Sequence, residues 1–137
     1  MKLEHVNALV KLRLEQARAT LDDARFLFEG GRSSQSIINR AYYAMFYAAL
    51  ALLQTIGKVP AKHSGVLSLF DTEFVLKGLF PKDLSKDFHQ AFDARQVSDY
   101  QPVQPASREQ AEALLEKAAR FILSVEQYLS ETQRPEG

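Results

Sequence analysis

The sequence predicts an all-α protein, an antiparallel up-and-down bundle of four main helices plus a shorter fifth helix. Three observations predict this fold. Apolar residues recur at spacings of three and four along four long segments, which is the period of one helix face. No stretch shows the sustained apolar–polar alternation of a half-buried strand. Glycines and prolines separate the segments, where turns are expected.

Length, charge and cysteine content narrow the class of protein. We expect one domain over residues 1–137, with a frayed tail at about 131–137. The 17 basic and 17 acidic residues cancel, so a generally basic nucleic-acid-binding surface is not expected and any RNA contact needs a local patch. The absence of cysteine excludes disulfides and thiolate metal sites and fits the cytoplasm. Met1 is followed by the charged residues Lys2 and Glu4, without the apolar run of a signal peptide, so we expect no signal peptide.

The first two helices have distinct patterns. The first ends at Gly30 and carries one apolar face, made of Val10, Leu14, Ala17, Leu21, Ala24 and Phe28. The second, residues 36–56, follows two candidate caps, Ser33 and Ser34, and is apolar around much of its circumference. One of its faces is made of Ile38, Ala41, Met45, Ala48, Leu52 and Ile56. Asn39 and Arg40 interrupt its apolar run, so we interpret it as a core helix and expect no membrane span.

The second helix also carries a polar and aromatic stripe, made of Ser36, Arg40, Tyr43, Tyr47, Leu50 and Gln54. A charged group on a central helix is costly unless it is paired or opens onto a cleft or a partner. This stripe therefore indicates either a functional site or a buried polar network.

The remaining helices complete the bundle. The short third helix begins near His63 and closes at Gly78. The fourth follows an apolar line that leads into an arginine, through Leu84, Phe88, Ala91 and Arg95. Asp99 lies one turn further and Tyr100 follows it. Ser107 and Gln110 have capping-box spacing at the start of the last helix, whose apolar face is Ala111, Leu114, Ala118, Phe121, Val125 and Tyr128.

Three motifs together resemble the HEPN superfamily, especially its short stand-alone prokaryotic branch. They are RAYYAMFYAALALL from Arg40, KHSG at 62–65 and RQVSDY at 95–100. The resemblance covers about residues 17–129. It implies a helical-bundle homodimer, often a metal-independent ribonuclease toxin paired with a small nucleotidyltransferase antitoxin. Arg95 matches the signature arginine of that family, and Gln96 matches the polar residue that commonly follows it.

The chain departs from the family signature, in which a histidine follows the arginine after four to six residues. Tyr100, Gln101 and Pro102 stand at the corresponding positions. The stand-alone branch resembles this chain in having an arginine, three residues and then aspartate–tyrosine. We therefore name Arg95, Asp99 and Tyr100 as the catalytic candidates, and a ribonuclease role does not transfer by the motif alone.

Each catalytic candidate has a possible role in RNA cleavage without a metal ion. Arg95 suits phosphorane stabilisation because a guanidinium binds phosphate oxygens in a fork. Asp99 can accept the 2′-hydroxyl proton if a dry site raises its pKa, and Tyr100 can orient a phosphate or stack on a base. Arg40 can add a second cation. The alternative is an intrahelical Arg95–Asp99 ion pair within a network that fixes helix register.

The other candidates are substrate-binding residues: Arg40, Tyr43, Tyr47, Gln96 and His63. The tyrosines can stack on bases or simply pack, and His63 can act as a general acid or be structural. The sequence shows no metal cluster and no phosphate loop, so no cofactor is expected. Two functions remain open. One is an RNA- or nucleotide-binding HEPN protein that can cleave RNA; the other is a non-catalytic dimeric module that docks a small nucleotidyltransferase.

Overall fold

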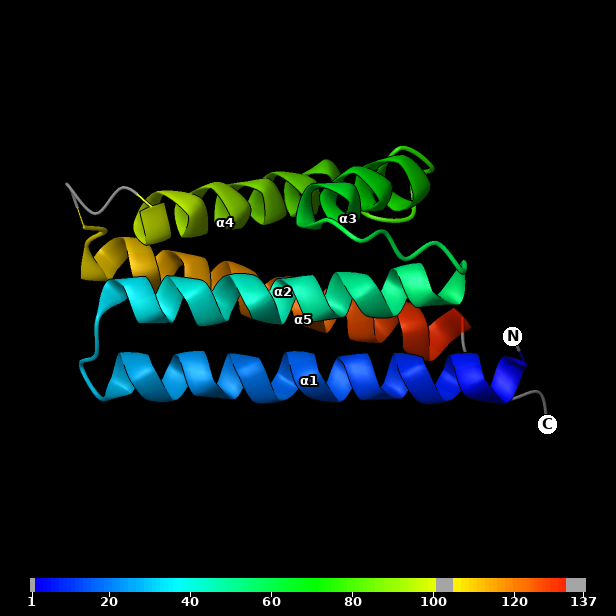
Figure 1. Cartoon of the computed structure of the whole chain (residues 1–137), viewed down its shortest axis with the longest axis horizontal. Coiled ribbons are helices and arrows are strands. Elements are labelled where there is room, and N and C mark those ends of the chain that lie inside the picture. Colours follow the sequence, from blue (N-terminus) through cyan, green and yellow to red (C-terminus); the bar gives the residue numbers. More distant parts are fainter. Residues whose placement is uncertain (1, 101–104, 133–137) are drawn as a thin grey trace.

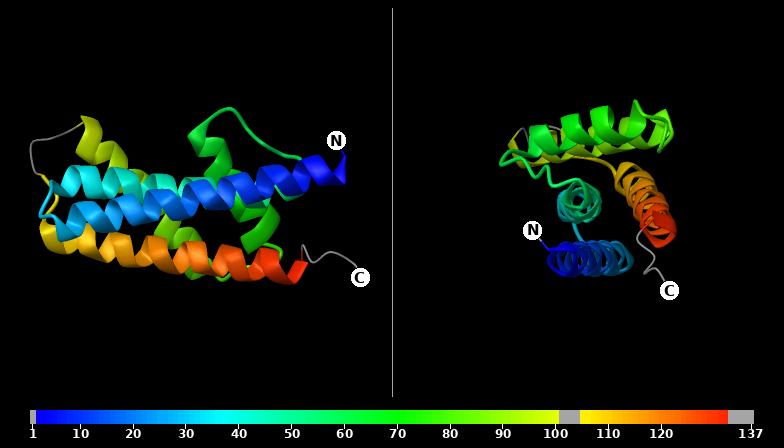
Figure 2. Two further views of the ribbon diagram at one scale, coloured as in Figure 1. Left: turned by 90° about the horizontal axis from the view of Figure 1, so that it is seen from below. Right: turned by 90° about the vertical axis from the view of Figure 1, so that its right-hand side faces the viewer.

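The structure, a computed structural model, describes residues 2–100 and 105–132, except the side chains of Asp99 and Tyr100. These residues form five α-helices and one π-helical turn, η1, without any strand. Four long helices run alternately up and down (Figures 1 and 2), namely α1 (Leu3–Glu29), α2 (Ser34–Thr55), α4 (Lys82–Tyr100) and α5 (Arg108–Thr132). The predicted all-α bundle is confirmed. Of the expected frayed tail, residues 131 and 132 still belong to α5, and 133–137 lie outside the described residues.

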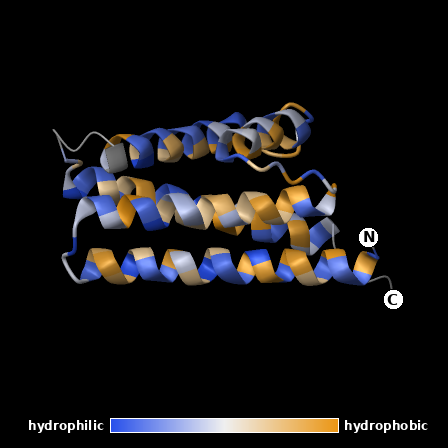
Figure 3. Ribbon diagram, in the orientation of Figure 1, coloured by the Kyte–Doolittle hydropathy of each residue, from blue (hydrophilic) through white to orange (hydrophobic). Residues whose placement is uncertain are grey.

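α2 is the central element of the bundle. It packs against α1, α3, α4 and α5, and the end-on view in Figure 2 shows it between α1 and the α3–α4 pair. Hydrophobic residues dominate its C-terminal half (Figure 3), and Ala48 in that half is fully buried. Within the described residues, no helix combines the length and apolar character needed to cross a bilayer. α2 is therefore a helix of the protein core, as predicted.

Local sequence signals fix the helix ends. The Ser33 hydroxyl accepts a hydrogen bond from the Ser36 amide at 3.2 Å, which caps α2. Gly31, after α1, has a φ of 66°, a left-handed conformation that glycine adopts without steric cost. At the start of α5, the Gln110 side chain accepts from the Ser107 amide at 2.8 Å and the Ser107 hydroxyl accepts from the Gln110 amide at 3.1 Å. Of the two serines predicted as caps of α2, Ser33 is the cap and Ser34 is the first helical residue, and the predicted capping box of α5 is confirmed.

The third helix differs from the uniform helix that the sequence predicts. α3 (His63–Phe70) continues into η1 (Asp71–Val75), where the Leu76 amide donates to the Asp71 carbonyl, five residues earlier, at 2.8 Å. The centre of the Phe70 ring lies 5.2 Å from the centre of the Phe121 ring of α5, and Phe70 is almost fully buried. This packing anchors α3 to the bundle and thereby positions its first residue, His63.

Replacing the fully buried Ala48 by leucine should destabilise the fold by about 1–3 kcal/mol, because added methylenes in a well-packed core force neighbouring side chains apart. Urea unfolding followed by circular dichroism measures the change. Ala19→Leu, at an exposed position of α1, is the matched control and should leave the free energy of unfolding within about 0.5 kcal/mol. Equal effects of the two substitutions would contradict the central position of α2.

Candidate functional site

Arg95 lies at the edge of the core, near the C-terminal end of α4. Its inward direction follows from helix spacing, because Leu84, Phe88 and Ala91 on the same line are buried. Its guanidinium carbon lies 5.4 Å from the centre of the Tyr43 ring and 5.6 Å from that of Tyr42. Both distances are within the range of cation–π attraction. The cation of α4 therefore meets the tyrosines of α2 within one chain.

Arg40 brings a second guanidinium to the same tyrosine. Its guanidinium carbon lies 5.2 Å from the centre of the Tyr43 ring. Its Nε and Nη2 atoms donate to the side-chain oxygen of Asn39 at 3.0 and 2.8 Å. The Asn39 amide is neutral, so this interaction does not compensate the positive charge of Arg40. Two cations from different helices thus converge on Tyr43, an arrangement that favours an anion nearby.

His63 enters the site from the first turn of α3. Its Nδ1 atom is hydrogen-bonded to the Tyr42 hydroxyl at 2.9 Å, and its ring stacks on Phe46 with centroids 4.3 Å apart. Tyr42 is fully buried, whereas His63 is half-buried. A buried phenol needs a hydrogen-bond partner. His63 supplies that partner, so the contact also fixes α3 against α2.

Burial keeps both members of this pair neutral, and the nearby cation adds to this effect for His63 alone. Burial raises the pKa of Tyr42 above its ordinary value of 10.0, and Arg95 only partly opposes this effect. Burial also lowers the pKa of His63 below its ordinary value of 6.5, and the positive charge of Arg95 lowers it further. At neutral pH the site therefore contains an uncharged imidazole beside a guanidinium.

The structure brings together four of the sequence candidates, namely Arg40, Tyr43, His63 and Arg95. Tyr47 lies at the margin, half-buried, with its ring centre 6.2 Å from that of Tyr43. Gln96 is exposed and projects about 100° around the helix from Arg95. Asp99 and Tyr100 belong to the last turn of α4, but their side chains lie outside the described residues, so their predicted roles stay predictions.

Tyr42 is the site residue that the sequence argument missed. It lies four residues after Ile38, on a buried line of α2, instead of on the polar stripe. The signal that identifies it is chemical: a tyrosine on a buried helix face requires a hydrogen-bond partner. A histidine near the start of the next helix is a suitable partner, but sequence spacing cannot show that the two meet.

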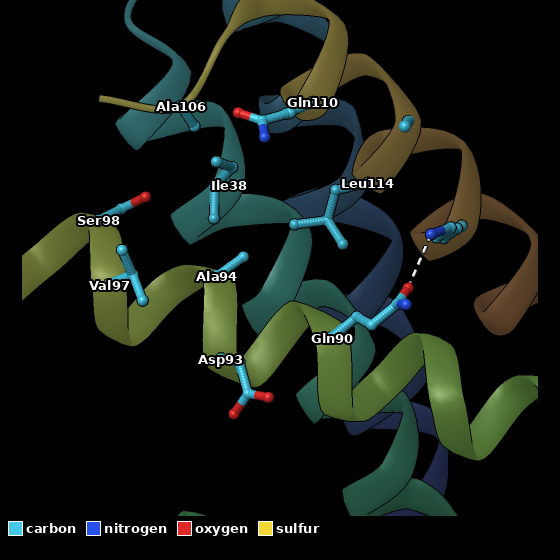
Figure 4. Close-up of a pocket in the computed structure, with 11 residues that line it drawn as sticks. Ile38, Gln90, Asp93, Ala94, Val97, Ser98, Ala106, Gln110 and Leu114 are labelled. Atoms are coloured by element: carbon cyan, nitrogen blue, oxygen red, sulfur yellow. Dashed lines mark hydrogen bonds between the residues drawn. The ribbon is translucent and has the colours of Figure 1, made fainter. Parts of the chain in front are cut away.

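A separate groove of about 480 Å³ lies between α4 and α5 (Figure 4). Ile38, Val97 and Leu114 contribute apolar surface, and the Lys117 ammonium donates to the Gln90 side-chain oxygen at 2.7 Å on its margin. Arg95 does not line this groove. Among the described residues, no cluster of three His, Cys, Asp or Glu side chains is suited to hold a metal ion.

The structure is an all-helical bundle in which an arginine lies near the end of α4. The sequence profile of the HEPN domain matches residues 10–128, and the chain therefore belongs to the HEPN family. A UPF0332 protein of Thermotoga maritima is 37% identical over 87% of this chain and 89% of its own length. Two proteins of Methanocaldococcus jannaschii are both named as candidate toxins. One is 34% identical over 94% of this chain and 86% of its own length. The other is 31% identical over 93% of this chain and 91% of its own length.

Arg95→Gln should raise the pKa of His63 while leaving it below 6.5, because the substitution removes the cation but not the larger effect of burial. NMR titration of the imidazole carbon-bound protons measures this pKa. Arg108→Gln is the control, since the guanidinium carbon of Arg108 lies 3.8 Å from the centre of the Phe28 ring, in a different cation–aromatic contact. A wild-type His63 that titrates at or above 6.5 would contradict the described environment.

Proposed function

We propose that this chain is a toxin-like HEPN protein that binds single-stranded RNA through Arg40, Tyr43 and Arg95. The observation that carries the proposal is the convergence of two guanidinium groups, from α2 and α4, on one tyrosine ring at 5.2 and 5.4 Å. Positive groups gathered on one part of the surface raise the local electrostatic potential and attract an anion. An RNA phosphate is an anion of suitable size and geometry for a guanidinium fork.

The aromatic residues around the cations favour RNA over an isolated anion. Tyr43 and Tyr47 are both half-buried, so part of each side chain remains open to solvent. Exposed aromatic faces stack on unpaired bases, and neighbouring arginines contact the backbone between them. Since the formal net charge is zero, binding depends on this local patch and should weaken steeply with added salt.

The remaining parts of the proposal come from the family. The two M. jannaschii relatives named as candidate toxins support a toxin-like role. The resemblance to stand-alone HEPN proteins supports a cytoplasmic homodimer with a small nucleotidyltransferase as its antitoxin-like partner.

Arg95→Gln should weaken binding of a single-stranded RNA oligomer about 10- to 100-fold, because a hydrogen bond to a charged group contributes about 1.5–3 kcal/mol. The slope of log Kd against log salt should also flatten by about 0.7 for each lost phosphate contact. Fluorescence anisotropy at several salt concentrations measures both changes.

Arg108→Gln is the matched control, because it also removes a guanidinium that contacts an aromatic ring, but away from the candidate site. It should leave the RNA affinity within about threefold of wild type, since it removes no proposed phosphate contact. Induced expression of the wild type should arrest growth, and Arg95→Gln should relieve the arrest at equal protein level. If the wild type binds no RNA at low salt, the proposed function fails.

A second candidate function is a non-catalytic dimeric module that docks a small nucleotidyltransferase. The α4–α5 groove favours it, because Val97 is 51% exposed beside that apolar surface. Val97→Glu should then abolish co-purification of a nucleotidyltransferase encoded next to this protein, whereas Arg95→Gln should preserve it. If Val97→Glu leaves the complex intact, the groove is not the docking surface.

A further inference from the structure

His63 and Arg95 share the same two tyrosine rings, although they come from different helices. The His63 ring centre lies 5.9 Å from that of Tyr42 and 5.6 Å from that of Tyr43. The Arg95 guanidinium carbon lies 5.6 and 5.4 Å from the same two centres. An imidazole and a phosphate-binding cation are therefore neighbours across a common aromatic surface, and His63 is half-buried, so it is not sealed in the core.

The hydrogen bond to Tyr42 engages one specific nitrogen of His63. Nδ1 is the atom bonded to the Tyr42 hydroxyl, and no hydrogen bond involves Nε2 within the part of the chain that the structure describes. When Nδ1 carries the proton, it donates to the phenolic oxygen and leaves the lone pair of Nε2 available. Tyr42 then acts as a positioning residue, because its contact fixes the orientation of the ring; its hydroxyl can donate to Nδ1 or accept from it, and the tautomer with the proton on Nδ1 is part of the proposal.

We propose that His63 is a proton acceptor for cleavage of an RNA phosphodiester in this site, with Tyr42 as its positioning residue and Arg95 as the group that stabilises the phosphorane. This inference rests on the proposed RNA binding and adds a reaction to it. It assigns the acid–base role to a histidine of α3, outside the RQVSDY segment of α4.

The proposed reaction balances without a metal ion or a cofactor. Nε2 of His63 takes the proton of the ribose 2′-hydroxyl while the 2′-oxygen forms a bond to the adjacent phosphorus. The bond from phosphorus to the 5′-oxygen then breaks, and that oxygen takes a proton from water. The imidazolium neutralises the resulting hydroxide. The products are a 2′,3′-cyclic phosphate and a 5′-hydroxyl, and Arg95 donates hydrogen bonds to the phosphorane oxygens.

The surroundings of His63 are consistent with this role. The polar and charged side chains that face it are Tyr42 and Tyr43 from α2 and Arg95 from α4, and Phe46 covers one face of its ring. Its lowered pKa keeps the imidazole unprotonated at neutral pH, which is the form that a base requires. By contrast, His89 is exposed and hydrogen-bonded through Nε2 to Asp71 at 2.7 Å, so it serves as a natural control.

The test compares wild type, His63→Asn and His89→Asn on one single-stranded RNA oligomer. Asparagine places its amide near the position of Nδ1 and removes the titrating nitrogen. We expect His63→Asn to cleave at least 100-fold more slowly, the usual size of a general-base effect, while its RNA affinity stays within threefold of wild type. His89→Asn should cleave like wild type. A 2′-deoxy substitution at the cleaved position should block the reaction in all three proteins.

The pH profile separates a catalytic role from a structural one. For wild type, cleavage should rise with pH and reach its plateau with a midpoint below 6.5, because deprotonation of His63 activates the base. Tyr42→Phe should lower the rate about tenfold and shift that midpoint. Added imidazole should partly restore cleavage by His63→Ala. These wild-type and rescue measurements remain decisive even if one variant unfolds.

The outcomes distinguish this inference from the proposed function. RNA binding by wild type without cleavage overturns the inference and leaves the proposed function intact. Unchanged cleavage by folded His63→Asn also overturns it. A midpoint near 4 that disappears in Asp99→Asn would assign the proton transfer to that carboxylate instead. Absence of both binding and cleavage overturns both proposals.

Discussion

The burial of α2 on most of its sides is the constraint from which the site follows. Because four other helices pack on it, a polar side chain on α2 must find its partner inside the protein or at an edge of the bundle. Tyr42 is fully buried, and its phenol is satisfied by His63, the first residue of α3. This hydrogen bond therefore adds to the packing of Phe70 in holding α3 against the bundle, and it brings His63 into the candidate site.

Much of this architecture could be predicted from the sequence because its causes are local. The spacing of apolar residues identified the helix faces, and serine and glycine identified several helix ends. The spacing from Leu84 to Arg95 also placed an arginine on the inward side of α4. Each of these inferences uses only residues within a few turns of one another, where helix geometry fixes relative direction.

The remaining features depend on contacts between distant segments, which spacing alone cannot specify. Tyr42 and His63 are separated by 21 positions and meet only because the loop after α2 returns α3 to the middle of that helix. The π-helical turn also lies where distant segments meet. Asp71 accepts hydrogen bonds from Ser85 and His89 of α4 at 2.6 and 2.7 Å, and these contacts accompany the wider turn that begins at Asp71.

The charge distribution favours the ligand site that we propose over a purely structural network. The Tyr42–His63 hydrogen bond already satisfies the buried phenol, and it needs no cation. Arg95 makes the neighbouring imidazole harder to protonate, and Arg40 adds a second positive charge to the same tyrosine. An ion pair within α4 would account for an arginine on that helix, but not for Arg40 of α2, which donates to the neutral side-chain amide of Asn39. The anion that we propose would give Arg40 a charged partner beside the Tyr43 ring, where the Arg95 guanidinium also lies.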